Sequence, residues 1–207
     1  GRAILHGKTE SDELKALADE LHVPYVVADV TDAKQVSAAV EEAANFGSIE
    51  GLVTSAGIFA GSESINDTTD EEWRKLFEVN VLGPIRFVRA LMPHLKQQER
   101  SSIVLLGSRS ELPSAASGSI AYGAIKAVFP KLAADLARQA APTTRVNSVA
   151  PGLVDTDMGG SVPTVRDTSL FQRVTQPAEI AEVVCFLLSE RARFITGQTV
   201  VEDGGSS

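Results

Sequence analysis

Tyr122 and Lys126 lie four positions apart, a spacing that places both side chains on the same face of a helix. A tyrosine whose pKa lies near its reference value of about 10 is a poor general base at neutral pH. A lysine ammonium one turn away favours the phenolate and brings the pair into a range where it can move protons. The spacing alone is weak, because tyrosine and lysine also meet in this way on ordinary helix surfaces.

Other polar and small residues follow apolar runs at the points where strands are expected to end. Ser108 follows one run, 14 residues before Tyr122, and its hydroxyl could hold a reacting oxygen. Asp29, Ser55-Ala56-Gly57 and Pro151-Gly152 stand in equivalent places. Ligands bind outside the carboxyl ends of the strands in an open parallel sheet, so these positions should converge on one edge. The sequence predicts a site there, with Ser110 as a rival to Ser108.

Short apolar runs alternate with segments of helical period. The runs are nearly continuous, as is typical of strands covered on both faces of a parallel sheet, and they occupy residues 3–6, 25–28, 52–54, 103–106, 146–150 and 199–201. Helices are expected over residues 11–21, 33–46, 69–95 and 177–188, the third opened by a capping box and bent at Gly83-Pro84. No repeat or linker interrupts the pattern, which predicts one α/β domain over residues 1–207.

The charge balance and the cysteine content exclude several classes of function. Lys and Arg number 19 against 27 Asp and Glu, and a net charge of −8 opposes nucleic-acid or anionic-membrane partners. No run of about 18 apolar residues is present, so no membrane span is predicted. Cys185 is the only cysteine, which favours a reducing, cytoplasmic location. The three histidines lack the spacing of metal ligands, so no metal site is predicted.

The motifs, taken in order, resemble those of the short-chain dehydrogenase/reductase family. The matching segments span roughly residues 8 to 205 and read ADVTD, LVTSAGI, VNVLGP, IVLLGS, YGAIK, RVNSVAPGLVDTDM and FITGQTVVEDGG. The resemblance implies a Rossmann-like, doubly wound parallel sheet with helices on both faces. It also implies an NAD(P)-dependent oxidoreductase that moves a hydride between nicotinamide and a carbonyl or secondary alcohol. Relatives of this kind form homodimers or homotetramers.

The resemblance assigns a role to each matching residue. Tyr122 would be the acid/base, Lys126 would lower its pKa and bind the nicotinamide ribose, and Ser108 would position the carbonyl. Asn80 would hold a water that links Lys126 to solvent. The other implied cofactor contacts are Asp29 and the Val30 amide at the adenine, Ala56 and Gly57 along the cofactor, and Pro151, Gly152, Val154 and Thr156 at the carboxamide.

Several of these residues also have a structural interpretation. The segment Asp29-Val30-Thr31-Asp32 could cap the following helix, Gly57 could serve only a turn, and Asn80 could end a helix. The loop Met158–Gln176 could cover the substrate or pack as an ordinary loop. Its apolar members are Val162, Pro163, Val165, Leu170 and Phe171, and its Arg166 and Arg173 could meet an acidic group.

The sequence departs from the family at its N-terminal end, where the glycine-rich turn TGxxxGxG that cradles the pyrophosphate is missing. Three interpretations are open. Residues 3–6 are the family's second strand, or residues 1–4 end the glycine motif with residues missing before Lys8, or residues 3–7 are a shortened first βα unit. Loss of a central strand leaves its two neighbours with unpaired backbone groups. We therefore expect either upstream sequence or closure of the sheet across the gap.

Two further expectations depend on these departures. If residues 3–6 are the second strand, Gly7 stands where NAD-preferring relatives carry an acid and Lys8 could meet a 2′-phosphate, so NADP is favoured over NAD. Two smaller departures remain. Thr54-Ser55 replaces the family's asparagine pair. Pro130 should kink the helix that follows Lys126, and this helix contributes to the dimer interface in relatives.

A second function stays open beside the enzyme. The missing glycine turn favours a binding or regulatory module of the same fold, without turnover. It equally favours an enzyme whose given chain lacks part of the cofactor site. The joint presence of Asn80, Ser108, Tyr122 and Lys126 opposes the module, because decay of a non-catalytic site would not spare all four.

Overall fold

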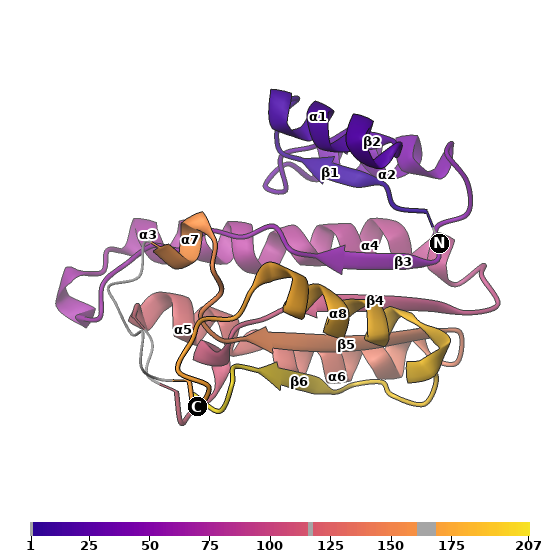
Figure 1. Ribbon diagram of the computed structural model, residues 1–207. Helices are drawn as coiled ribbons and strands as arrows, with labels where there is room; N and C mark the ends of the chain where they lie inside the picture. The colour runs from indigo at the N-terminus through magenta and orange to yellow at the C-terminus, as the bar shows by residue number, and fades with distance from the viewer. Residues whose placement is uncertain (1, 116–117, 161–168) are drawn as a thin grey trace.

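The computed structural model describes residues 2–115, 118–160 and 169–207 and shows two parallel sheets (Figure 1). The smaller sheet pairs β1 (Leu5–Gly7) with β2 (Tyr25–Val27). The larger has the order β3 (Gly51–Thr54), β4 (Ser101–Leu106), β5 (Thr144–Pro151) and β6 (Thr199–Glu202). Every pairing is parallel. Each strand falls on an apolar run of the sequence, so the predicted α/β class is confirmed.

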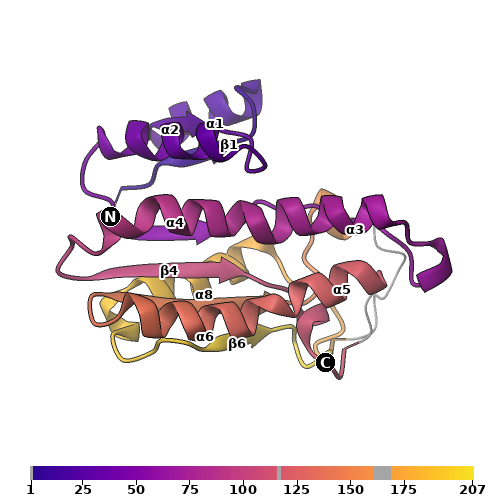
Figure 2. The ribbon, with the colours of Figure 1, turned by 180° about the vertical axis from the view of Figure 1, so that it is seen from behind.

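Helices lie on both faces of these sheets, as Figures 1 and 2 show from opposite sides. One face carries α1 (Asp12–Leu21) and α8 (Pro177–Leu188), and the other carries α2 (Ala33–Ala44), α4 (Gly83–Leu95) and α6 (Val128–Ala140). The shorter helices are α3 (Asp70–Phe77), α5 (Ile120–Lys126) and α7 (Asp157–Gly160), with single 3₁₀ turns at Ile65–Asp67, Arg109–Glu111 and Glu190–Ala192. No helix among the described residues is long and apolar enough to cross a bilayer.

The main core lies between the larger sheet and the helices α4 and α6. Ile103 and Leu105 of β4 and Val146 of β5 are fully buried against Leu95 and Phe129. On the opposite face, a second cluster joins β4 and β5 to α8. The two strands that precede the candidate site are thus covered on both faces, which fixes the edge where their carboxyl ends meet.

The helix expected over residues 69–95 is opened by the predicted capping box. The amide of Thr69 donates to Glu72 Oε2 at 2.7 Å, and the amide of Glu72 donates to Thr69 Oγ1 at 3.2 Å. A π-helical turn, Glu78–Leu82, then separates α3 from α4. Pro84 has no N–H and cannot donate an α-helical bond to the carbonyl of Asn80, which explains why the ladder shifts at this point.

The helix after Lys126 is interrupted, as Pro130 predicts. Helix α5 ends at Lys126 and α6 begins at Val128, with Ala127 between them. Pro130 lies in the first turn of α6, where a missing N–H is tolerated. The break leaves α5 as a short, separate helix that carries Tyr122 and Lys126.

The two sheets do not join across the described residues, because β1 pairs only with β2 and β3 only with β4. The expected closure of the sheet is therefore wrong. Helix α2 packs directly on α4, with Val36 and Ala39 against Phe87 and Ala90. Packed helices lie about 8–10 Å apart, and this distance equals about two strand spacings of 4.8 Å. The two sheets are therefore connected through this helical layer.

The same pairing bears on the N-terminal interpretations. A shortened first βα unit would place residues 3–7 beside β3, but β1 hydrogen bonds to β2 alone among the described strands. The arrangement fits the interpretation in which residues 3–6 are the family's second strand.

Candidate active site

Four of the predicted residues meet at the carboxyl edge of the larger sheet. Tyr122 and Lys126 lie on α5, Ser108 directly follows β4, and Asn80 lies in the π-helical turn. The start of α5 is fixed by Ser119, whose hydroxyl accepts from the amide of Tyr122 at 3.2 Å and donates to the carbonyl of Ala60 at 2.8 Å. The loop after β3 thus helps to set the orientation of Tyr122.

Lys126 is buried beneath Tyr122 and anchored to the end of β4. Its Nζ donates to the carbonyl of Leu106 at 2.8 Å and lies 5.7 Å from the ring centroid of Tyr122 and 4.7 Å from that of Phe129. Burial lowers the pKa of Lys126 to about 8, against the opposing effect of the Glu111 carboxylate. A buried ammonium this close to neutrality can change its protonation state at little cost.

Tyr122 carries the hydroxyl that the spacing argument selected. Burial raises its pKa, a hydrogen bond with the Ser108 side chain lowers it, and the charge of Glu111 raises it further. Its ring packs edge-on against Phe59, with centroids 5.1 Å apart. Ser108 is the serine whose side chain affects the pKa of the phenol, and its choice over Ser110 as the catalytic serine stays a prediction. At neutral pH the phenol is protonated here, and the lowering of its pKa by Lys126 stays a prediction.

Sequence reasoning missed Glu111, a buried carboxylate between Ser108 and Lys126. Its Oε2 accepts from the Ser108 amide at 3.1 Å, while the Ser110 amide donates to Ser108 Oγ at 3.2 Å. Burial raises the pKa of Glu111 to about 7, opposed by the Ser108 amide and the charge of Lys126. Its Oε1 has no hydrogen-bond partner among the described residues. The spacing Ser108-x-x-Glu111, a capping box placed directly after a strand, was the signal that could have found it.

Both polar atoms of the Asn80 side chain hydrogen bond to the backbone of the segment that follows β3. Its Oδ1 accepts from the Ile58 amide at 2.9 Å, and its Nδ2 donates to the Ile58 carbonyl at 3.0 Å. A Cβ on Gly57 would lie 2.7 Å from Asn80 Oδ1, so this glycine permits the close approach. Asn80 does not end a helix, because the π-helical turn continues into α4. Its proposed water is not tested by these contacts.

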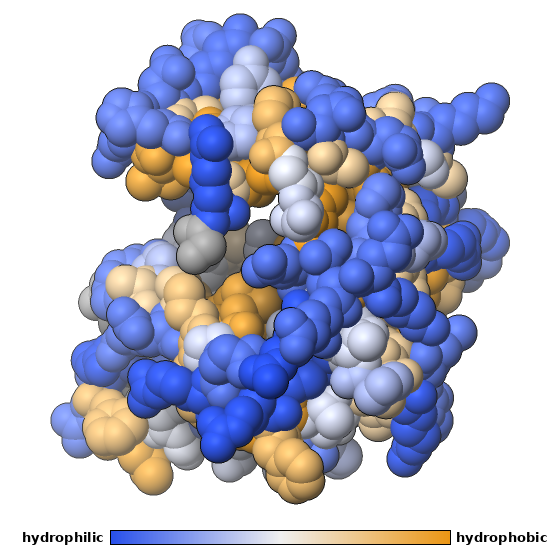
Figure 3. All heavy atoms as spheres, turned by 90° about the vertical axis from the view of Figure 1, so that its right-hand side faces the viewer, coloured by the Kyte–Doolittle hydropathy of each residue, from blue (hydrophilic) through white to orange (hydrophobic). Residues whose placement is uncertain are grey.

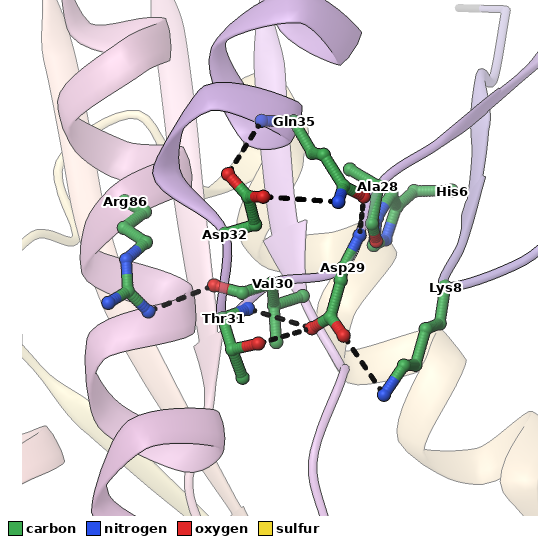
Figure 4. A network of polar contacts seen from close by, with 9 residues as sticks. All are labelled: His6, Lys8, Ala28, Asp29, Val30, Thr31, Asp32, Gln35 and Arg86. Atoms are coloured by element: carbon green, nitrogen blue, oxygen red, sulfur yellow. Dashed lines mark hydrogen bonds and ion pairs between the residues drawn. The ribbon is translucent and has the colours of Figure 1, made fainter.

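Asp29 lies at the carboxyl end of β2, where Figure 4 shows it within a polar network. Its carboxylate accepts from the Thr31 amide at 2.9 Å and the Thr31 hydroxyl at 2.8 Å, and it pairs with Lys8 at 3.0 Å. These contacts lower the pKa of Asp29 to about 2. Lys8, the cation expected at a 2′-phosphate, is therefore already held beside the residue expected at the adenine.

The capping role suggested for this segment belongs to Asp32. Its side chain accepts from the amide of Lys34 at 2.8 Å at the start of α2. Val30 is buried, and its carbonyl accepts from Arg86 at 3.0 Å (Figure 4). Asp32 therefore provides the cap, whereas Asp29 bonds to Thr31 and Lys8, and its contact with the adenine stays a prediction.

The residues that follow β5 also lie at the carboxyl edge of the larger sheet. Gly152 donates to the carbonyl of Glu202 at 2.9 Å, and a Cβ there would lie 2.8 Å from the backbone of Asp203. Pro151 ends β5, and Val154 bridges to Thr175. Thr156 accepts from the Gly159 amide at 3.2 Å. These residues follow β5 and contact the end of β6, and their role at the carboxamide stays a prediction.

The predicted loop over the site is described only in part. Val162, Pro163, Val165 and Arg166 lie outside the described residues. Leu170 and Phe171 are exposed and lie against Gly204 and Gly205. Arg173 pairs with Glu179 at 2.6 Å, so it is engaged in an ion pair.

The residues fit one half of a nicotinamide cofactor. Tyr122 and Lys126 could hold a nicotinamide ribose, and Gly57 packs closely on Asn80 near them. The sequence contains no TGxxxGxG turn, and a cavity opens between β1 and β3 (Figure 3).

Comparisons with known proteins agree with this geometry. The profile of the family described as Enoyl-(Acyl carrier protein) reductase matches residues 3–207. The chain is 34% identical to a 3-alpha-(or 20-beta)-hydroxysteroid dehydrogenase of Mycobacterium bovis, with 100% of this chain and 80% of the relative covered.

Two solved structures from Brucella melitensis have the same fold. One is a short-chain dehydrogenase/reductase at 31% identity and a TM-score of 0.92, covering 100% of this chain and 86% of its own. The other is a 3-ketoacyl-(acyl-carrier-protein) reductase complexed with NADH, at 28% identity and a TM-score of 0.92, covering 99% and 87%.

Proposed function

Because the chain belongs to the short-chain dehydrogenase/reductase family of nicotinamide-dependent oxidoreductases, we propose that it interconverts a carbonyl and a secondary alcohol with Tyr122 as the acid/base. The observation that carries the proposal is the burial of Lys126 beneath Tyr122 on the same helix, with Nζ 5.7 Å from the ring centroid and held by the carbonyl of Leu106 at the end of β4. A phenol, a hydroxyl and an ammonium group at one edge of the sheet can transfer protons. A cluster with a purely structural role would not require this combination of groups.

Tyr122, Ser108 and Lys126 have different roles at the substrate oxygen. Tyr122 donates its phenolic proton to the carbonyl oxygen in reduction and accepts one from the alcohol in oxidation. Ser108 donates a hydrogen bond to the same oxygen and stabilises the charge that develops there. Lys126, anchored on Leu106, supplies a positive charge beneath the phenol and a proton to restore it. The bound nicotinamide supplies or accepts the hydride.

A carbonyl screen tests the proposed turnover. We expect the purified chain to oxidise NADPH or NADH in the presence of at least one class among 3-oxoacyl thioesters, secondary ketones and the hydroxysteroid-type ketones suggested by the Mycobacterium relative. Cofactor binding without oxidation across the panel would instead support the second candidate, a binding module.

Cofactor preference belongs to the same proposal. Gly7 leaves no acid at the end of β1, and Lys8 lies beside Asp29, so we propose NADP over NAD. The 2′-phosphate would compete with Asp29 for the ammonium of Lys8. We also propose a homo-oligomer in the cytoplasm, a reducing compartment that suits the single Cys185.

Replacing Lys8 tests that preference. We expect Lys8→Ala to weaken NADPH binding about tenfold, the loss of one exposed phosphate contact, while NADH binding stays the same. Lys8→Arg, which keeps the charge, should bind NADPH like the wild type. Fluorescence titration of the wild type and both variants with each cofactor measures these affinities, and tighter binding of NADH than of NADPH by the wild type would reverse the assignment.

A further inference from the structure

The side chain of Arg86 joins two segments that lie far apart in the sequence. Arg86 lies near the start of α4, and 17% of its side chain is exposed. Its Nη1 donates to the carbonyl of Val30 at 3.0 Å, a contact drawn in Figure 4, and its Nη2 donates to the carboxylate of Glu78. A guanidinium group presents its donors in a rigid planar fork, so one side chain holds both partners in a fixed geometry.

The Val30 carbonyl belongs to the segment that follows β2. Its neighbours on either side bond to each other, because the carboxylate of Asp29 accepts from the amide of Thr31 at 2.9 Å. Val30 itself is buried and packs on the first residue of α4, where a Cβ on Gly83 would lie 2.9 Å from Val30 Cγ2. Residues 29–31 therefore form a turn of fixed shape, and Arg86 attaches this turn to α4.

The Glu78 carboxylate lies on the far side of the π-helical turn. Glu78 is the first residue of that turn, which ends at Leu82, so the ion pair with Arg86 spans its whole length. The same turn carries Asn80, which bonds to the backbone of Ile58 in the segment after β3. Arg86 thus braces the turn after β2 against an element that is itself fixed to the next strand-end segment.

These segments lie where a ligand of a parallel α/β sheet binds, outside the carboxyl ends of the strands. A loop that must become ordered when its ligand arrives lowers the affinity, whereas a loop that is already held in place does not. Arg89, one turn further along α4, differs from Arg86 in this respect. It is exposed, and within the described part of the chain its side chain has no hydrogen bond or ion pair.

We propose that Arg86 is a positioning residue for the cofactor site, and that it holds residues 29–31 in place for the adenine end of the nicotinamide cofactor. The inference rests on the proposed function, in which Asp29 and Val30 contact the adenine. Arg86 acts through a backbone carbonyl and not on the 2′-phosphate, so it strengthens the binding of NADPH and NADH equally. Lys8 differs, because its loss is expected to weaken NADPH binding alone.

Arg86→Met keeps an unbranched side chain and removes the guanidinium group. We expect it to weaken the binding of NADPH and of NADH by about tenfold each, the loss of one charge-assisted hydrogen bond. Adenosine 2′,5′-bisphosphate carries only the adenine half of NADP, and as a competitor it should lose the same factor. Asn80 keeps its bonds to Ile58 in this variant, so kcat at saturating cofactor should change by less than about twofold. A general loss of stability would not produce this split between cofactor affinity and kcat.

Two further variants complete the test. Arg89→Met removes the same group from the same helix and should bind both cofactors like the wild type. Arg86→Lys keeps the charge but lacks the fork, and it should weaken both cofactors equally by a factor smaller than that of Arg86→Met. This variant also carries the test if Arg86→Met does not fold, which thermal melting without cofactor reveals.

Three outcomes overturn the inference while the proposed function stands, because the wild type still binds cofactor in each. They are wild-type affinity for both cofactors in the Arg86 variants, equal weakening by Arg89→Met, and a loss confined to NADPH. The last would assign Arg86 to the 2′-phosphate. A wild type that binds neither NADPH nor NADH overturns the proposed function, and the role of Arg86 falls with it.

Discussion

Tyr122→Phe is expected to reduce kcat for carbonyl reduction by roughly 10²–10⁴-fold, the range that general acid catalysis supplies. The substitution removes one oxygen from a partly buried ring that keeps its packing on Phe59. The fold and the cofactor affinity should therefore be preserved, and KM should change little. Steady-state kinetics on any substrate found in the carbonyl screen measure the effect.

The chain offers a matched control, because it has only one other tyrosine. Tyr25 lies on β2 and donates its hydroxyl to Glu10 at 2.7 Å, away from the candidate site. Tyr25→Phe removes the same atom from the same residue type and should retain the wild-type rate. An equal loss in both variants would point to a general effect on the protein and against a role of the Tyr122 phenol.

Glu111→Gln is expected to change how stability depends on pH. The folded-state pKa of Glu111 is raised to about 7 from an ordinary 4.5, chiefly by burial. The folded protein therefore binds this proton more tightly than the unfolded chain. This difference in proton binding adds about 3 kcal/mol to the free energy of unfolding below about pH 4.5. The added free energy is lost as the pH rises to about 7. The Gln variant should lack this fall between pH 4.5 and 7.

Urea unfolding of wild type and variant across that window measures the difference. Glu179→Gln is the control, because the pKa of Glu179 is lowered to about 2 by Arg173. Its contribution is present above its ordinary pKa and is lost only in more acidic solution, so it should not alter the slope between pH 5 and 7. A wild type and a Glu111→Gln protein with parallel curves would show that Glu111 does not titrate near neutrality.

The same substitution should affect catalysis. The carboxylate of Glu111 raises the pKa of both Tyr122 and Lys126. When the charge of Glu111 is removed, the phenolate that oxidation requires forms at lower pH. The acidic limb of kcat/KM for alcohol oxidation should therefore move to lower pH in Glu111→Gln. A limb at an unchanged or higher pH would contradict this coupling. Glu111 acts here as a positioning residue, through Ser108 and the local charge.

Local pattern was enough to predict most of the elements. The six strands fall on apolar runs, and the capping box at Thr69 and the proline at position 177 mark helix starts that the structure reproduces. Pro130 likewise predicted a break that lies within a few residues of it. These features depend on neighbours in the sequence, where the geometry of one turn or one strand is decided.

Features that depend on tertiary contacts were not predictable in the same way. The packing of α2 on α4 joins segments that are about 50 residues apart in the sequence. The pairing of Lys8 with Asp29 joins the ends of two strands and gives no local signal. Glu111 was missed because serine and glutamate at this spacing usually cap helices on the surface, and only the structure shows that this pair is buried.

The pH dependence of kcat/KM for carbonyl reduction, compared between wild type and Tyr122→Phe, tests the acid/base role of Tyr122 most directly. Reduction needs the protonated phenol, so the wild-type value should be constant at lower pH and fall as the pH rises through the pKa of Tyr122. The low residual value of Tyr122→Phe should lack this fall. A basic limb of the same position and slope in both proteins would contradict the assignment of Tyr122 as the proton donor.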